Sequence, residues 1–281
     1  MADVPGGPTP PPPPGTPPGP GSLRPRTLGE ILSAAFDVYK NNAANLLLIV
    51  AVVVVPLSFL SALSSHFIGA PKTHTVEIFG KPATVAYSRS LLATVVALII
   101  AAAIGVIISA ILQAAILRGA AEATIGDPVD VEASYRWGFK RFASVFLVAI
   151  LVGITVAIGF LLLVIPGIIF LVFFSVSVPA LVVENRRGTE AMRRSWGLVS
   201  GHFWHALVVI LVAAIITGIV AGIIGSIGGS NWVLRWIFGA IGQIITAPFT
   251  ALVSVLLYLD LRARKEALTV ERLRAELASS M

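Results

Sequence analysis

The sequence contains no cysteine and has few charged residues for its length. Without cysteine, the chain forms no disulfide framework, no thiolate metal site and no cysteine nucleophile. Charged residues account for 12% of its 281 residues, whereas soluble domains carry about 25%. Because 57% of the residues are hydrophobic, this composition excludes an ordinary soluble protein.

Catalytic motifs are also missing. The only lysine that follows a glycine is Lys81, and a proline comes next, which excludes a phosphate-binding loop. No HExxH metal motif occurs. His202 and His205 lie on one helix face, but no third ligand is evident, so histidines at headgroup level are the plainer alternative to a metal site. The sequence predicts no enzyme, no metal and no cofactor.

The hydrophobic residues fall in six long stretches. These occupy residues 43–63, 91–117, 142–165, 167–183, 203–227 and 236–259. A membrane-spanning helix needs about 20 mostly apolar residues. The sequence therefore predicts an all-α integral membrane protein, with six transmembrane helices in a domain over 27–260. No Asp, Glu, Lys or Arg falls inside the stretches, which disfavours a proton-coupled transporter, and the mid-span polar groups come chiefly from Gln113 and Gln243.

The two ends of the chain differ from this domain. Residues 1–26 hold 11 of the 18 prolines and nothing apolar to bury. They predict a disordered, proline-rich tail, with a PxxP ligand for a partner domain as the alternative. Residues 261–281 mix Arg, Glu and Leu and predict a helical tail.

Three shorter segments have the period of an amphipathic helix and precede pairs of spans. They cover residues 27–40, 130–142 and 189–199, and the first opens with a capping box from Thr27 to Glu30. Helices of this kind are too short and too polar to span, so we expect them to lie in the membrane interface. The predicted layout is three blocks, 27–117, 130–183 and 189–259, each an interfacial helix followed by a helical hairpin. Whether the blocks form a true repeat stays open, because they share a pattern and not identity.

Two loops carry further predictions. Residues 64–90 contain two strand-like runs around Gly80-Lys81, which predict a small β-hairpin with Pro82 in an edge role. The stretch 142–183 is interrupted only by Pro166-Gly167, so it either spans twice or forms a re-entrant hairpin. Two spans are favoured, because nothing there is polar enough to need a protein-lined cavity.

Basic residues indicate the orientation. Sixteen of the 20 Lys and Arg fall in alternate segments that include both ends of the chain. The positive-inside rule then places both termini in the cytoplasm of a bacterial cell, across its inner membrane. Since the basic residues flank the spans, a membrane explains the net charge of +6 and no nucleic-acid partner is expected.

Two groups of residues are candidates for contacts. Gly218 and Gly222 form a GxxxG ridge that predicts close helix packing, within the monomer or between protomers. Four arginines fall within nine residues before the fifth span: Arg186, Arg187, Arg193 and Arg194. They predict contact with anionic lipid, and a role as a topology determinant is the alternative.

Several motifs resemble a known family. They are Arg26-Thr27-Leu28-Gly29-Glu30-Ile31-Leu32, Pro166-Gly167-Ile168, Pro179-Ala180-Leu181-Val182-Val183-Glu184, Arg193-Arg194-Ser195-Trp196, Leu257-Tyr258, Asp260-Leu261-Arg262 and Arg264-Lys265-Glu266. In this order, over about 26–268, the chain resembles the bacterial glycerophosphoryl diester phosphodiesterase membrane-domain family. The resemblance implies a multi-span membrane region whose standalone members have no settled activity. No stretch here supplies the clustered acids and histidines of the catalytic domain to which that region is sometimes fused.

These observations favour a non-enzymatic membrane protein that acts as a scaffold, assembly or regulatory subunit with an unidentified protein partner. The alternative is a transporter or channel for a lipid or small molecule, which a cavity lined by Gln113, Gln243 and nearby Ser or Thr would favour. An intramembrane enzyme acting on lipid headgroups stands lowest, with His202, His205 and Glu190 as its only acid–base groups.

Overall fold

The computed structural model describes the backbone of residues 24–67, 72–78, 81–87, 91–229, 231–266 and 268–279, and the side chains of 24–59, 108–229, 231–266 and 268–276. Most of the proline-rich segment 1–26 lies outside the described residues. The elements in chain order are α1 (Leu28–Asn41), α2 (Ala43–Phe67), β1 (Lys72–Ile78), β2 (Lys81–Tyr87), α3 (Leu91–Ile125), α4 (Val131–Leu162), α5 (Val164–Phe173), α6 (Ser177–Glu184), α7 (Thr189–Val199), α8 (Phe203–Ser226), α9 (Trp232–Lys265) and α10 (Val270–Ser279).

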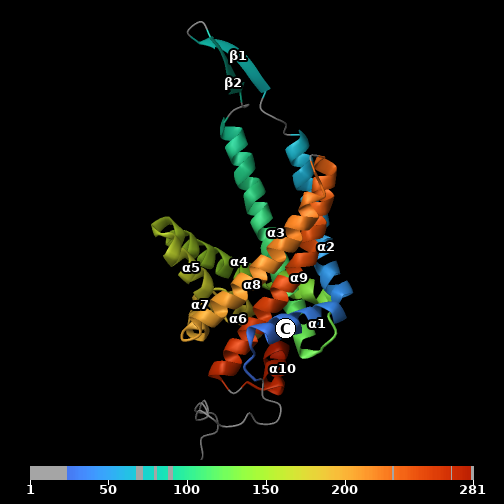
Figure 1. The fold of residues 1–281 in the computed structure, drawn as a ribbon, viewed down its shortest axis with the longest axis vertical. Helices are drawn as coiled ribbons and strands as arrows, with labels where there is room; N and C mark the ends of the chain where they lie inside the picture. The colour runs from blue at the N-terminus through green and yellow to red at the C-terminus, as the bar shows by residue number, and fades with distance from the viewer. Residues whose placement is uncertain are drawn as a thin grey trace, which may run out of the picture.

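Long apolar helices dominate the described chain and confirm a helical membrane-embedded architecture. Five are long and apolar enough to cross a membrane, or six if α1 and α2, which meet at 82°, are counted as one bent span. In Figure 1, α2, α3, α8 and α9 extend in one general direction, while α4 and α5 project to one side. The shorter helices α1, α6, α7 and α10 gather at the opposite end from the β-hairpin.

The C-terminal half of α9 is the centre of the fold. Residues 251–262 are buried at every position except the half-buried Ser254. A helix that is buried all round must be surrounded by other elements, and α1, α2, α3, α6, α7 and α8 all contact α9. On α8, by contrast, only Ala206, Val209 and Ala213 are buried, and its large apolar side chains are exposed, as expected of a helix that faces lipid.

The N-terminal helix begins as predicted. The backbone N–H of Glu30 donates to Thr27 Oγ1 at 3.4 Å, and the backbone N–H of Thr27 donates to Glu30 Oε2 at 2.8 Å, which confirms the capping box. The hydrogen bonds and charges of this segment lower the pKa of Glu30, chiefly through Thr27. Ile31 and Ala35 are the buried residues on the inner face of α1.

The β-hairpin is also confirmed. β1 and β2 pair antiparallel, with Thr75 opposite Thr84 and Glu77 opposite Pro82. A two-stranded sheet has two edges, so a proline is tolerated in either strand.

Two predicted helix boundaries are wrong. The amphipathic segment 130–142 is not a separate helix, because α4 runs without a break from Val131 to Leu162. The predicted tail helix from 261 is partly the end of α9, which continues to Lys265 before α10 begins. Hydropathy marks where a helix leaves the apolar region and not where its hydrogen bonds end.

The chain reverses at Leu163 and not at Pro166-Gly167. Leu163 is extended, with φ −165° and ψ 156°, and Pro166 lies in the first turn of α5, where its missing N–H costs no hydrogen bond. Glycine is required on both sides of this reversal. A Cβ on Gly167 would lie 2.4 Å from the Phe160 ring, and one on Gly159 would lie 2.9 Å from Gly167 Cα. The break is therefore set by close helix packing.

Candidate functional site

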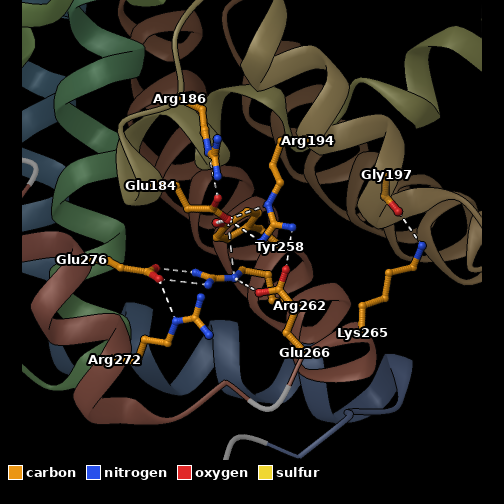
Figure 2. Close-up of polar contacts among 10 residues, drawn as sticks. All are labelled: Glu184, Arg186, Arg194, Gly197, Tyr258, Arg262, Lys265, Glu266, Arg272 and Glu276. Atoms are coloured by element: carbon orange, nitrogen blue, oxygen red, sulfur yellow. Dashed lines mark hydrogen bonds and ion pairs between the residues drawn. The ribbon is translucent and has the colours of Figure 1, made fainter. Parts of the chain in front are cut away.

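A buried arginine joins four helices at the end of the bundle that carries α10 (Figure 2). Arg262 has no exposed surface. Its two terminal nitrogens form a fork with Glu276, at 2.6 and 3.1 Å, and its Nε donates to Glu266 Oε2 at 3.1 Å. Glu184 Oε1 lies 3.5 Å from the same Nε. Such a two-pronged contact is among the strongest that a protein makes.

Glu184 links this arginine to α7. Arg194 Nε donates to Glu184 Oε1 at 2.7 Å, and Arg194 Nη1 lies 2.5 Å from Glu266 Oε1. The hydroxyl of Tyr258 also donates to Glu184, and the guanidinium of Arg262 sits over the Tyr258 ring, 5.7 Å from its centre. Arg186 and Arg272 add outer ion pairs to Glu184 and Glu276. We call the set Glu184, Arg186, Arg194, Tyr258, Arg262, Glu266, Arg272 and Glu276 the Arg262 cluster.

The electrostatics of the cluster favour the charged forms. Burial alone raises the pKa of Glu266, but the hydrogen bond and charge of Arg194 outweigh it, so the pKa lies below its ordinary value. Burial likewise disfavours the Arg194 cation, yet the hydrogen bonds to Glu266 and Glu184 hold its pKa above the ordinary value. Buried charges are tolerated when every one has a partner, as here. The arrangement locks α6, α7, α9 and α10 together.

A buried carboxylate, Asp260, holds the N-terminal segment against the bundle. Asp260, 2% exposed, accepts from the backbone N–H of Arg26 at 2.6 Å and from Arg264 Nε at 2.8 Å. Its Oδ2 also lies 2.9 Å from His205 Nε2 at the start of α8. Arg264 completes a ring by donating to the Arg26 carbonyl at 2.6 Å. Arg26, which the sequence predicts to be part of the disordered tail, therefore has its backbone held in place.

A cavity lies between α3, α6 and α9, beside the Arg262 cluster. Its volume is about 530 Å³, within the range of about 300–1,000 Å³ that is usual for small-molecule sites. Its polar lining consists of Ser109, Gln113, Ser175, Thr250 and Ser254. Its apolar lining consists of Leu112, Ile116, Leu117, Val178, Pro179, Ala247 and Ala251. Among these described lining residues none is charged.

The polar groups of the cavity differ in their hydrogen bonds. Ser175 Oγ donates to the Val172 carbonyl at 2.8 Å, and Thr250 Oγ1 donates to the Thr246 carbonyl at 3.0 Å. These two hydroxyls keep only acceptor capacity. The side chains of Gln113 and Ser254 have no hydrogen-bond partner in the part of the chain that the structure describes. Since an amide carries two donors and one acceptor, Gln113 has a full set of unmatched groups at the cavity wall.

The four arginines predicted to contact lipid differ in their exposure and in their ion pairs. Arg194 belongs to the Arg262 cluster and is only 23% exposed, so it is not presented to headgroups. Arg186 is exposed but lies 3.4 Å from Glu184. Arg187 and Arg193 are exposed, and lipid contact by these two stays a prediction.

The GxxxG ridge makes no close contact with the part of the chain that the structure describes. Gly218 and Gly222 are exposed, and nothing lies within 4 Å of the position that a Cβ on either would take. Of the two predicted alternatives, an intramolecular contact finds no support among the described residues, and a contact between copies stays a prediction. The close approach of α8 to α9 uses other small residues, because a Cβ on Gly242 would lie 3.6 Å from Ala221 Cα.

The histidine pair and the glutamine pair named from the sequence do not form shared sites. His205 binds Asp260, whereas Nδ1 of His202 is buried without a partner among the described residues. Burial, with the nearby charges of Arg264 and Lys265, lowers the pKa of His202. No group of three or more His, Asp or Glu that would hold a metal occurs in the described ranges. Gln113 lines the cavity, but Gln243 does not.

Sequence reasoning missed most of the Arg262 cluster. The sequence places Arg262, Glu266 and Glu276 in the predicted tail and predicts no contact for Glu184. One signal was present, since Arg262 and Glu266 are four residues apart, as are Arg272 and Glu276, which indicates helical ion pairs past the apolar stretch. The motifs quoted for the resemblance supply residues of two groups. Glu184, Arg194, Tyr258, Arg262 and Glu266 belong to the Arg262 cluster, and Arg26, Asp260 and Arg264 belong to the contacts around Asp260.

Comparison with protein-family models, with curated proteins and with solved structures finds no match to this chain.

Proposed function

We propose that the protein binds a lipid or another small amphiphile in the cavity between α3, α6 and α9, as a membrane transporter or channel does at its substrate site. The observation that carries this proposal is the amide of Gln113, which is exposed at the wall of a 530 Å³ cavity and has no hydrogen-bond partner among the described residues. An unmatched polar group in an apolar region is costly. A ligand or water that matches these groups removes that cost.

The position of the cavity suits a lipid. Gln113 precedes Arg118 on α3 by about 8 Å of helix, and Ser254 precedes Asp260 on α9 by about 9 Å. Arg118 and Asp260 belong to the charged end of the bundle, which we assign to the cytoplasmic surface by the positive-inside rule. The cavity then lies just inside the apolar layer, at the depth where headgroups give way to acyl chains.

The walls of the cavity differ in how firmly they are held. The C-terminal end of α6 is fixed by Glu184 in the Arg262 cluster, whereas its first turn carries Val178 and Pro179 at the cavity. Pro248 lies inside α9 beside the lining residue Ala247. Helices bend at proline, so movement of these two segments would change access without disturbing the cluster.

The proposal includes the layout that the sequence predicts. Six spans arranged as three hairpins cross the inner membrane of a bacterium, with both termini in the cytoplasm. α1 and α7, the two separate amphipathic helices, lie along the inner leaflet. The N-terminal turns of α4 reach the same level, where Glu132 and Arg136 form an exposed ion pair.

The absence of cysteine makes the cavity easy to test. Ser254→Cys places a single thiol in the lining, and Ser226→Cys places one on the exposed face of α8 as a control. In detergent, we expect a bacterial polar lipid extract to slow maleimide labelling at position 254 by severalfold more than at 226. Equal slowing at both positions would contradict a lipid-binding cavity.

A second candidate, a non-enzymatic scaffold, assembly or regulatory subunit, is favoured by a different observation. A backbone hydrogen bond to Asp260 holds the N-terminal segment against the bundle, and the ion pair of Arg262 with Glu276 holds α10. Such fixed ends suit a docking platform for a protein partner. Co-purification of a stoichiometric partner that is lost on deletion of 1–23 would support this role, and a chain that purifies alone with unchanged lipid binding would count against it.

A further inference from the structure

We propose that the ligand of the cavity presents an uncharged, hydrogen-bonding headgroup of the kind carried by diacylglycerol. This inference rests on the proposed function of the same cavity and adds the class of its ligand. Three properties of the lining lead to it: the absence of charge, the balance of donors and acceptors, and the share of apolar surface.

A charged headgroup finds no counter-charge in the cavity. None of the described lining residues is ionisable. The nearest charged groups on the same three helices are already engaged, since Arg118 lies 2.7 Å from Glu122, Glu184 is bound by Arg194, and Asp260 is bound by Arg264. Removing a phosphate from water without a partner carries a large desolvation cost. The cavity therefore disfavours phospholipid headgroups.

A phosphate has a better place elsewhere on the protein. A separate pocket of about 370 Å³ at the charged ends of α3 and α4 has three basic lining residues, Arg118, Arg136 and Lys140, and two acidic ones, Glu122 and Asp130, with Trp137 beside them. Arg118 and Arg136 already pair with Glu122 and Glu132, but the lining keeps one net positive charge. Together with a tryptophan at the interface, that charge suits an anionic headgroup better than the uncharged cavity does. The contrast between the two pockets shows that the neutrality of the cavity is particular to it.

The donors and acceptors of the cavity match a hydroxyl and an ester. The hydroxyl oxygens of Ser175 and Thr250 act only as acceptors, because each donates to its own helix. A ligand hydroxyl supplies the donor that they lack. The Gln113 amide and the Ser254 hydroxyl supply donors for an ester carbonyl. A glycerol with one free hydroxyl and two esters satisfies both sets.

The apolar lining of the cavity suits the first methylenes of the ligand's acyl chains. Leu112, Ile116, Val178 and Ala247 line it together with the polar groups. A volume of 530 Å³ holds a headgroup and the first methylenes, and the rest of each chain extends into the bilayer.

The test uses two photoactivatable lipids with identical diazirine acyl chains, a diacylglycerol and a phosphatidic acid. They are crosslinked to the intact protein in nanodiscs, and the labelled peptides are mapped. We expect the diacylglycerol to label segments of α3, α6 and α9 at the cavity, and the phosphatidic acid to label the region of α4 instead.

Two glutamines supply a matched pair of variants. Gln113→Leu removes an exposed amide of the lining, and Gln243→Leu removes a likewise exposed amide of α9 that is not in the lining. Loss of neutral hydrogen bonds to the ligand should reduce cavity labelling by roughly fivefold to tenfold in Gln113→Leu and leave it unchanged in Gln243→Leu. Ser254→Ala, a smaller change, tests the same site if Gln113→Leu does not fold.

The outcomes separate this inference from the function on which it rests. Phosphatidic acid that labels the cavity as strongly as diacylglycerol, with the same dependence on Gln113, overturns the uncharged headgroup and leaves a lipid-binding cavity. If neither probe labels the cavity segments, the inference is overturned, and the thiol protection at position 254 then decides whether the cavity binds lipid at all.

Discussion

The backbone N–H of Arg26 donates a 2.6 Å hydrogen bond to Oδ1 of Asp260, which joins the first described segment to the end of α9. Asp260 is 2% exposed and also holds Arg264 and His205. One carboxylate therefore positions the entry of the chain into the bundle, its last long helix and the start of α8.

We expect Asp260→Asn to destabilise the protein strongly. The change removes a buried negative charge and leaves Arg264 without its counter-charge, and breaking a buried ion pair costs about 3–5 kcal/mol. Thermal unfolding in detergent measures the effect. Glu132→Gln is the matched control, since the carboxylate of Glu132 pairs with Arg136 but is 80% exposed. Equal shifts in the two variants would show that burial of Asp260 contributes nothing.

Arg262 should tolerate lysine poorly and leucine worse. Lysine keeps the charge but loses the two-pronged contact with Glu276, whereas leucine leaves three carboxylates without their central partner. We expect limited proteolysis after α9 to increase in the order wild type, Arg262→Lys, Arg262→Leu, because α10 is held through Glu276. Arg274→Gln removes only an exposed pair 3.7 Å long and a 3.3 Å hydrogen bond to the Ile125 carbonyl, so it should increase the cleavage rate much less than either Arg262 variant.

Acid should weaken the Arg262 cluster through Glu266. Its pKa in the folded protein lies below the ordinary 4.5, since the contacts with Arg194 outweigh burial. A carboxyl with a depressed folded pKa contributes stability that is complete above its unfolded pKa and is lost as the pH falls through the folded value. The free energy of unfolding should fall with pH below about 4.5, and Glu266→Gln should flatten that slope. Parallel slopes in the two proteins would exclude a contribution from Glu266.

Arg187 and Arg193 should govern contact with anionic lipid. Both are exposed, unlike Arg194. Each basic residue near an anionic surface contributes about 1 kcal/mol. The variant Arg187→Gln with Arg193→Gln should insert normally, yet retain less phosphatidylglycerol after extraction, as measured by mass spectrometry of bound lipid. Arg235→Gln, before the last span, is the control, and equal lipid retention would leave the arginines with the topology role alone.

Local signals predicted much of the fold. α8 begins at Phe203, where the predicted stretch begins, and the capping box set the start of α1 because its contacts span three residues. The reversal at Leu163 was misplaced because it depends on how Gly159 and Gly167 pack against the facing helix. The Arg262 cluster was missed because its pairs are distant in the sequence, as with Glu184 and Arg262.

The cavity was anticipated only in part. Gln113 was recognised as a polar group within a span, but nothing in the sequence distinguishes it from Gln243. The difference arises from α6, whose first turn leaves space beside Gln113. Such a space depends on how three helices pack, and hydropathy carries no information about it.

Native mass spectrometry of the gently extracted protein tests the central claim most directly, because it detects a ligand in the cavity without a choice of probe. We expect the wild type and Gln243→Leu to carry one additional species with the mass of a lipid lacking a phosphate headgroup, and Gln113→Leu to have lost most of it. A wild-type protein with no bound species, or one whose bound species is equally abundant in Gln113→Leu, would contradict the account.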